Sequence, residues 1–185
     1  MSSPNPRVSG MQPRSGAPRL RARLRWLATR VGGNLLLLVL AFGASHLYTT
    51  RNVTKGAAPP IVATAIDGSM VQIPAPDGRA RIVHFFATWC GVCSAQEHNL
   101  RALAESGQLV LVASDSGDEA DVRAHARAQR LGMPIVLDDD GSLKRAYGVT
   151  AYPTTFFIDP AGNVDFVEVG YTTELGLRAR LFATR

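Results

Sequence analysis

The chain has 185 residues, two cysteines and a formal net charge of +5, and 46% of its residues are hydrophobic. This length suits one domain with an appendage, and two cysteines alone exclude a disulfide framework. Residues 1–55 contain nine Lys and Arg and no acidic residue, whereas residues 56–185 contain eleven basic and fifteen acidic residues, so no nucleic-acid-binding face is expected on the domain.

The N-terminal quarter of the chain predicts a membrane anchor. Residues 1–25 are rich in Pro, Ser, Gly and Arg and have too few apolar residues to pack, so we expect a disordered basic tail. Residues 26–48 follow as an apolar stretch that is long enough to cross a bilayer. Trp26 and Tyr48 bound this stretch, and both are residue types typical of membrane interfaces. We therefore predict one transmembrane helix over 26–48.

The charges around this stretch predict its orientation. Seven arginines lie in residues 1–30, against Arg51 and Lys55 just after the stretch. The positive-inside rule then keeps the N-terminus in the cytoplasm and places the rest of the chain on the outer side of the membrane. A cleavable signal peptide is the alternative, since Ala41 and Gly43 could satisfy the small-residue cleavage rule. Both interpretations export the domain to an oxidising compartment.

A polar linker is predicted over 49–59, and a folded domain over 60–185. At the start of the domain, residues 61–74 alternate apolar and polar side chains around the dipeptide Asp67-Gly68. This pattern predicts an N-terminal β-hairpin.

Residues 82–93, with the sequence IVHFFATWCGVC, join a predicted strand to a predicted helix. The first five are an apolar run rich in β-formers, and from Ser94 onward apolar residues recur at helical spacing. Cys90 and Cys93, the cysteine pair, stand at the junction, which is typical of thiol redox chemistry. Unpaired amides at a helix N-terminus stabilise a thiolate. We therefore predict that Cys90 is the nucleophile, at the exposed end, and that Cys93 is the more buried resolving thiol.

Other interpretations of the cysteine pair fit less well. A structural disulfide would close a very small loop and stabilise little. A zinc site needs four ligands, and no second C-x-x-C or paired histidines follow. Soft thiolates also suit Cu(I), which would give a copper-binding metallochaperone that uses His84 or His98 as a further ligand. We predict no metal and no organic cofactor, because the redox-active group is the cysteine pair itself.

The rest of the chain alternates strands and helices. We predict a buried strand over 109–113, a helix over 118–131 closed by Gly132, a strand over 134–137, a solvated turn over 138–141, a helix over 142–147, two strands over 154–158 and 164–169, and a closing helix over 173–182. This order predicts an α/β fold, a mixed sheet with helices on both faces.

Two segments of the sequence resemble the thioredoxin-fold superfamily. They are residues 87–93, ATWCGVC, and residues 152–159, YPTTFFID. Within that superfamily the chain is similar to the membrane-anchored, periplasmic TlpA-type thiol–disulfide oxidoreductases, and to their suppressor-of-copper-sensitivity branch. The resemblance covers residues 60–185, and it implies a thioredoxin-like mixed sheet flanked by helices.

The resemblance also implies which residues support the cysteine pair. The Tyr152–Pro153 bond is expected to be cis and to face the cysteines, so that an extended substrate can pair with the neighbouring backbone. The supporting residues implied around this site are Trp89, Gly91, Val92, His84, Tyr152 and Thr154. The dipeptide Gly91-Val92 departs from the Gly-Pro of thioredoxin, so whether the protein is a reductant or an oxidant is left open.

Two of the expected roles have purely structural alternatives. His84 would pass protons to Cys93, or would be a core histidine bonded to backbone. Tyr152 would border the substrate groove, or would be a packed aromatic beside a turn. We further expect Trp89 and Phe86 to pack around the cysteines. The helix residues Gln96, Glu97 and His98 are expected to face solvent.

The sequence as a whole therefore predicts an exported, membrane-anchored enzyme that exchanges disulfides with protein thiols. Its expected partners are client proteins with thiols or disulfides, a redox partner protein and the inner membrane. A docking module or thiol reductase for apocytochrome c, acting in cytochrome maturation, is a further alternative.

Overall fold

The computed structural model describes residues 31–41, 43, 54 and 56–184. The chain divides into two compact units, Met1–Ser45 and His46–Arg185. In the first unit residues 31–41 are helical and every one of them is exposed. Across the residues that the structure describes, no helix is long and apolar enough to cross a membrane. The predicted tail and both ends of the predicted span fall outside those residues.

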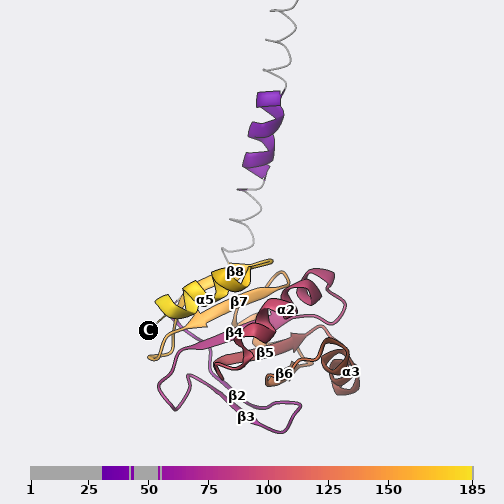
Figure 1. The fold of residues 1–185 in the computed structure, drawn as a ribbon, viewed down its shortest axis with the longest axis vertical. Helices are drawn as coiled ribbons and strands as arrows, with labels where there is room; N and C mark the ends of the chain where they lie inside the picture. Colours follow the sequence, from indigo (N-terminus) through magenta and orange to yellow (C-terminus); the bar gives the residue numbers. More distant parts are fainter. Residues whose placement is uncertain (1–30, 42, 44–53, 55, 185) are drawn as a thin grey trace, which may run out of the picture. The chain divides into compact units, whose positions relative to one another are not determined.

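A six-stranded mixed sheet forms the centre of the second unit, with the strand order β1-β8-β7-β4-β5-β6 (Figure 1). Strands β4, β5 and β6 run parallel, and β7 runs antiparallel to both of its neighbours. This confirms the predicted mixed sheet. Its strands are β1 (Gly56–Ala57), β4 (Arg81–Phe86), β5 (Leu109–Ser114), β6 (Ile135–Asp138), β7 (Thr154–Ile158) and β8 (Asn163–Val169).

The first strand corrects a predicted boundary. Gly56 and Ala57 of β1 pair with Val164 and Asn163 of β8. The predicted linker over 49–59 therefore contains part of the sheet, and the folded domain begins before residue 60. Alternation gave no signal for this strand, because it is only two residues long.

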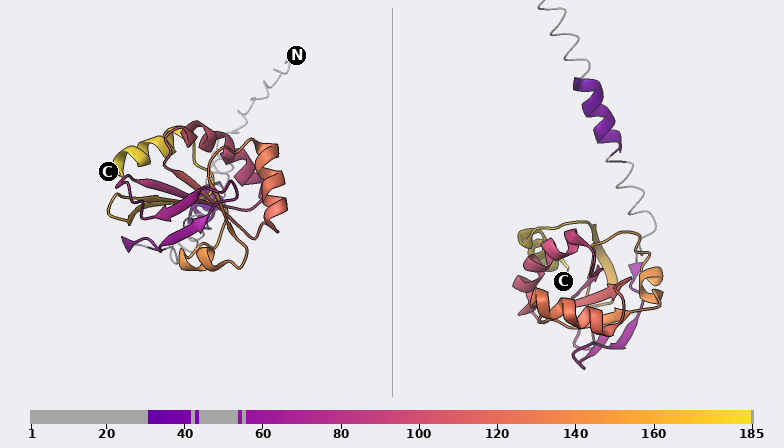
Figure 2. Two further views of the ribbon diagram at one scale, coloured as in Figure 1. Left: turned by 90° about the horizontal axis from the view of Figure 1, so that it is seen from below. Right: turned by 90° about the vertical axis from the view of Figure 1, so that its right-hand side faces the viewer.

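Three helices cover one face of the sheet: α2 (Gly91–Ala104), α3 (Glu119–Gln129) and α5 (Glu174–Ala183) (Figure 2). Their apolar side chains pack against Ile82 and Phe86 of β4. The crossovers from β4 to β5 and from β5 to β6 both join parallel neighbours. Because such connections are right-handed, α2 and α3 lie on the same face.

The opposite face is covered by the hairpin and by α4 (Ser142–Ala146), whose C-cap is Tyr147. In the predicted hairpin, β2 (Ile61–Thr64) pairs antiparallel with β3 (Met70–Ile73). The turn lies at Asp67-Gly68, as predicted, because Gly68 has a φ of +87°. Buried apolar side chains of both strands join the core of this face.

Helix α3 begins close to the predicted residue and ends earlier than predicted. The Asp118 side chain is its N-cap and accepts a hydrogen bond from the Asp121 amide. The helix ends at Gln129, because Arg130 adopts a left-handed conformation with a φ of 54°. Gly132, the predicted stop, lies beyond this cap.

The predicted solvated turn over 138–141 is wrong at its first residue. Asp138 ends β6 and is only 2% exposed. Its carboxylate accepts hydrogen bonds from the amides of Leu143 and Lys144 and from the Ser114 hydroxyl. These bonds hold the first turn of α4 at the end of the sheet and stabilise the buried charge.

Candidate active site

The cysteine pair lies at the N-terminus of α2, where β4 ends. Cys90 is the N-cap, with extended backbone, and its Sγ accepts a hydrogen bond from the Cys93 amide at 3.2 Å. Cys90 and Cys93 form a disulfide. Cys90 is 8% exposed and Cys93 is 0% exposed. The order of burial therefore matches the prediction, although even Cys90 shows solvent only a small part of its surface.

The surroundings of the helix N-terminus favour a negative sulfur. No acidic side chain lies in the first turn of α2. The partial positive charge of the first-turn amides is therefore not offset by a neighbouring carboxylate of that turn. Gly91 and Val92 form the start of the helix, and Val92 is exposed. A Cβ on Gly91 would meet no atom within 4 Å, so packing does not demand glycine here.

The loop before β7 contains Pro153, and its neighbour Tyr152 packs against the cluster that contains the cysteine pair. The Tyr152–Pro153 peptide bond is cis, as predicted. The Pro153 carbonyl accepts a hydrogen bond from the Gly170 amide at 2.7 Å. Thr154, the first residue of β7, is buried, and its hydroxyl donates to the Ala151 carbonyl. Both bonds fix the loop from inside the protein.

Trp89 and Tyr152, the aromatic pair, join the two loops. Their ring centroids lie 6.1 Å apart with the planes almost perpendicular. Trp89 is 69% exposed, so the prediction that it packs around the cysteines is wrong, whereas Phe86 is buried among them as expected. Tyr152 packs against the cluster that contains the cysteine pair. It therefore lies beside the cysteine pair, and its place at the border of a substrate groove stays a prediction.

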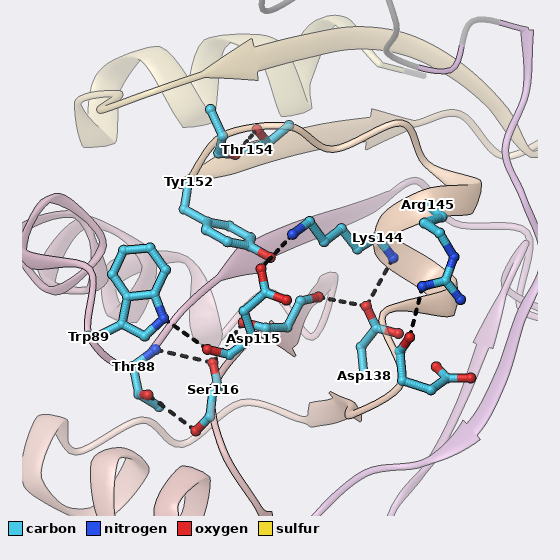
Figure 3. Close-up of polar contacts among 12 residues, drawn as sticks. Thr88, Trp89, Asp115, Ser116, Asp138, Lys144, Arg145, Tyr152 and Thr154 are labelled. Atoms are coloured by element: carbon cyan, nitrogen blue, oxygen red, sulfur yellow. Dashed lines mark hydrogen bonds and ion pairs between the residues drawn. The ribbon is translucent and has the colours of Figure 1, made fainter.

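Asp115 and Lys144 complete the site, and sequence reasoning found neither. The Asp115 carbonyl accepts a hydrogen bond from Trp89 Nε1 at 2.8 Å, and its Oδ2 accepts one from the Tyr152 hydroxyl at 3.0 Å (Figure 3). Lys144 forms an ion pair with the same Asp115 oxygen, and its Nζ lies 5.5 Å from the Tyr152 ring centroid.

The charges of this network shift three pKa values. The hydrogen bond from Lys144 lowers the pKa of the Asp115 carboxyl, and the same bond raises the pKa of Lys144. Burial, followed by the bond to Asp115, raises the pKa of Tyr152. At neutral pH the network therefore holds one carboxylate, one ammonium and one neutral phenol.

His84 is fully buried at the centre of β4. It lies on the same face of the strand as Ile82 and Phe86, the face that carries the cysteine pair. Its Nδ1 is 2.9 Å from the Thr155 hydroxyl, and Nε2 has no partner in the described part of the chain. Burial lowers the pKa of His84 to about 3. His84 is therefore neutral at pH 7, and it hydrogen-bonds a side chain rather than the backbone.

The neutrality of His84 makes a prediction about stability at acid pH. The unfolded chain protonates His84 below about pH 6.5, whereas the folded protein does so only near pH 3. Between these values the unfolded state binds more protons, so the free energy of unfolding decreases as the pH falls. In this window we expect His84 to lower the free energy of unfolding by up to about 1.4 kcal/mol for each pH unit of acidification.

Urea denaturation at pH 7, 6, 5 and 4 measures this contribution. The His84→Gln variant, which keeps a hydrogen-bonding side chain, should lose less stability on acidification than the wild type. His98→Gln is the matched control, because His98 lies exposed on α2. Parallel stability curves for the wild type and His84→Gln would contradict the assignment of a depressed pKa.

Gln96 and Glu97 are buried, so the prediction that they face solvent is wrong, while His98 is exposed as predicted. Gln96 Oε1 accepts a hydrogen bond from the Thr172 amide at 2.8 Å. Glu97 Oε1 lies 2.7 Å from His125 Nε2 on α3. The helical spacing from Cys93 was the available signal, because residues three and four positions on share its face.

Comparisons with known proteins agree with this geometry. Residues 54–167 match the AhpC/TSA family. The chain is 28% identical over 169 residues to the thioredoxin-like protein YneN of Bacillus subtilis, covering 85% of this chain and 96% of YneN. It is 27% identical over 155 residues to the thiol-disulfide oxidoreductase ResA of Bacillus subtilis, covering 77% of this chain and 84% of ResA.

A solved structure shows the same fold. The thiol:disulfide interchange protein of the thioredoxin family from Chlorobium tepidum superimposes with a TM-score of 0.62 and 25% identity. The similarity covers 71% of this chain and 97% of that protein. The predicted thioredoxin-like sheet is therefore confirmed.

Proposed function

Because the chain belongs to the AhpC/TSA family and is a thiol–disulfide oxidoreductase, we propose that it is an exported, membrane-anchored enzyme of the TlpA type. In this proposal it exchanges disulfides with client proteins through Cys90 and Cys93. The observation that carries the proposal is the closed Cys90–Cys93 disulfide with Cys90 as the N-cap of α2.

The reaction is a pair of exchange steps. In the reduced enzyme the Cys90 thiolate attacks one sulfur of a client disulfide, and the other client sulfur leaves as a thiolate that takes up a proton. The Cys93 thiol then loses its proton and attacks Cys90 Sγ, which releases the second client thiol. The client gains two electrons, the enzyme loses two, and the Cys90–Cys93 disulfide is restored. The reverse sequence oxidises a client dithiol, and a redox partner protein resets the enzyme.

Cys90 is the first to react in this proposal for two reasons. It is the more exposed sulfur, so a client can reach it. It also caps the amides of α2, which stabilise its thiolate relative to its thiol. Pro153 stands in the opposing loop and has no amide hydrogen, so the client backbone can approach the loop as an added strand.

Membrane anchoring by residues 26–48 rests on the sequence and on one structural feature. Residues 31–41 are helical and exposed, and all of them except Asn34 are apolar or glycine. A helix that is apolar all round needs an apolar environment. With the arginine-rich tail in the cytoplasm, the domain would lie in the periplasm of a bacterial cell.

Thiol exchange with a protein disulfide tests the enzymatic part of the proposal. The full-length chain in detergent, prereduced with dithiothreitol, is expected to reduce insulin and to end as the Cys90–Cys93 disulfide. The reaction is followed by insulin turbidity and by mass spectrometry of the enzyme. A chain that binds Cu(I) through both thiols but leaves insulin oxidised would be a copper carrier instead.

The two cysteines also provide a test of location, because the chain contains no others. A membrane-impermeant maleimide added to intact, reduced spheroplasts should label Cys90 in the full-length protein. Labelling only after lysis would place the domain in the cytoplasm and end the export proposal.

A further inference from the structure

We infer that Asp115 is a positioning residue for client binding, which holds the aromatic pair as a platform for an apolar side chain next to the client's cysteine. This inference rests on the proposed function, because it concerns the same reaction at the same cysteine pair. Asp115 acts through Trp89 and Tyr152 and does not touch the reacting sulfurs itself.

Asp115 is the point at which four chain segments meet. Its carbonyl binds the indole of Trp89, directly before Cys90, and its carboxylate binds the hydroxyl of Tyr152, directly before Pro153 (Figure 3). Lys144, from α4, forms an ion pair with the same carboxylate. One residue therefore fixes an aromatic side chain on each side of the site.

The backbone of Asp115 is held in a conformation that favours this geometry. Its φ of 50° lies in the left-handed region, which costs a non-glycine residue about 1 kcal/mol and which aspartate tolerates better than most residues. The neighbouring Ser116 anchors the turn, because it accepts hydrogen bonds from the amide and the hydroxyl of Thr88. The turn after β5 is thus tied to the loop before Cys90. Residues held in sparsely populated backbone conformations cluster at functional sites, and Asp115 lies beside the cysteine pair's aromatic neighbours.

The surface that results is apolar and electrically balanced. Trp89 is 69% exposed and Val92 is 50% exposed, so the helix start carries apolar area on both sides of Cys90. The charges of Asp115 and Lys144 compensate each other. Trp89 is exposed and Tyr152 is half-buried, and hydrogen bonds hold both side chains in place. Aromatic side chains held in this way lose little entropy on binding, and tryptophan and tyrosine are enriched in protein interfaces. The chemistry therefore favours a polypeptide with an apolar or aromatic side chain beside its cysteine.

Two disulfide-bonded peptides test the inference, identical except that phenylalanine or serine stands beside the reactive cysteine. Their reduction by the full-length enzyme is followed under steady-state conditions. The wild type should have a KM about 10-fold lower for the phenylalanine peptide, with a similar kcat for both.

Asp115→Gly removes the carboxylate but keeps the carbonyl and tolerates the left-handed φ. We expect it to raise KM for the phenylalanine peptide about 10-fold, which is the loss of one hydrogen bond to a charged group, and to change kcat less than 2-fold. Tyr152→Phe should raise KM by a similar factor. The double variant Asp115→Gly/Tyr152→Phe should have a KM no higher than that of either single variant, because both changes remove the same hydrogen bond.

Asp115→Asn should restore much of the KM, because an amide oxygen can still accept from Tyr152 and asparagine also tolerates a positive φ. Glu168→Gln is the matched control. It removes a half-buried ion pair between Glu168 of β8 and Arg180 of α5, and it should leave KM for both peptides unchanged. A merely structural role would lower kcat and thermal stability equally in Asp115→Gly and Asp115→Asn.

The outcomes separate the inference from the proposed function. If the wild type reduces neither peptide, the proposed function fails. If the wild type reduces both with equal KM, or if Asp115→Gly keeps the wild-type KM for the phenylalanine peptide, the inference is wrong and the oxidoreductase stands.

Discussion

Cys90→Ser is expected to stop disulfide exchange, with turnover of insulin reduced at least about 1,000-fold, because a serine hydroxyl is not ionised at neutral pH and cannot displace a sulfur. Cys93→Ser should also turn over poorly, for a different reason. Its Cys90 still attacks, but no thiol resolves the product. The Cys93→Ser variant should therefore accumulate mixed disulfides with client proteins, visible on non-reducing gels as bands that dithiothreitol removes.

The double variant Cys90→Ser/Cys93→Ser is the control for non-specific adducts. Both single variants lose one sulfur of the same buried disulfide, so a loss of folding would affect both of them. If Cys90→Ser and Cys93→Ser trap the same clients in equal amounts, the division of labour between the two sulfurs is wrong.

His125→Ala should destabilise the protein by about 1–3 kcal/mol, because it leaves the Glu97 carboxyl buried without its hydrogen-bond partner. The Glu97 side chain is 1% exposed and that of His125 is 11% exposed. Glu97 Oε2 already has no hydrogen-bond partner within the described region. Removing the partner of Oε1 would leave the whole carboxyl group unsatisfied, and it would also remove the contact between the His125 and Phe86 rings, whose centroids lie 5.7 Å apart.

Denaturant titration at pH 7 measures this loss as a shift of the unfolding midpoint. His98→Ala, on the exposed side of α2, is the control and should change the stability by less than about 0.5 kcal/mol. Adding Glu97→Gln to His125→Ala removes the charge and should recover part of the loss. Equal stability of His125→Ala and the wild type would show that the pair contributes nothing.

The central strand, the cysteine helix and the proline loop could all be predicted from the sequence. Each is a local pattern: an apolar run before a C-x-x-C, and a Tyr-Pro directly before a second apolar run. The order of strands and helices then restricts the sheet, because parallel connections are short and right-handed. Local patterns of this kind were therefore sufficient to predict the fold.

The residues that sequence reasoning missed depend on contacts between distant segments. Asp115 and Lys144, the two missed residues, lie 29 positions apart. Tyr152, which was predicted, lies 37 positions after Asp115, and no periodicity links the three residues. These side chains lie together because Asp115, directly after β5, has a left-handed backbone conformation, and because Asp138 holds the first turn of α4 through a hydrogen bond from the Leu143 amide. Neither feature has a sequence signature.

The wrong predictions that Gln96 and Glu97 of α2 face solvent have a different origin. Gln96 and Glu97 are polar, and residue type suggested a solvated face. Their spacing from Cys93 placed them toward the core instead, where Thr172 and His125 satisfy part of their hydrogen-bonding capacity. In this helix the geometric period was the better guide to burial than the chemistry of the side chain.

The unequal burial of the two sulfurs has a consequence under oxidative stress. In the reduced enzyme, peroxide would reach the sulfur of Cys90 and convert it to a sulfenic acid, while Cys93 is shielded from the same attack. The shielded thiol lies within bonding distance and can condense with the sulfenic acid, expelling water and forming the same disulfide that closes the catalytic cycle. Damage that would otherwise proceed to an irreversible sulfinic acid is diverted into a disulfide, which a thiol reductant can return to the active dithiol.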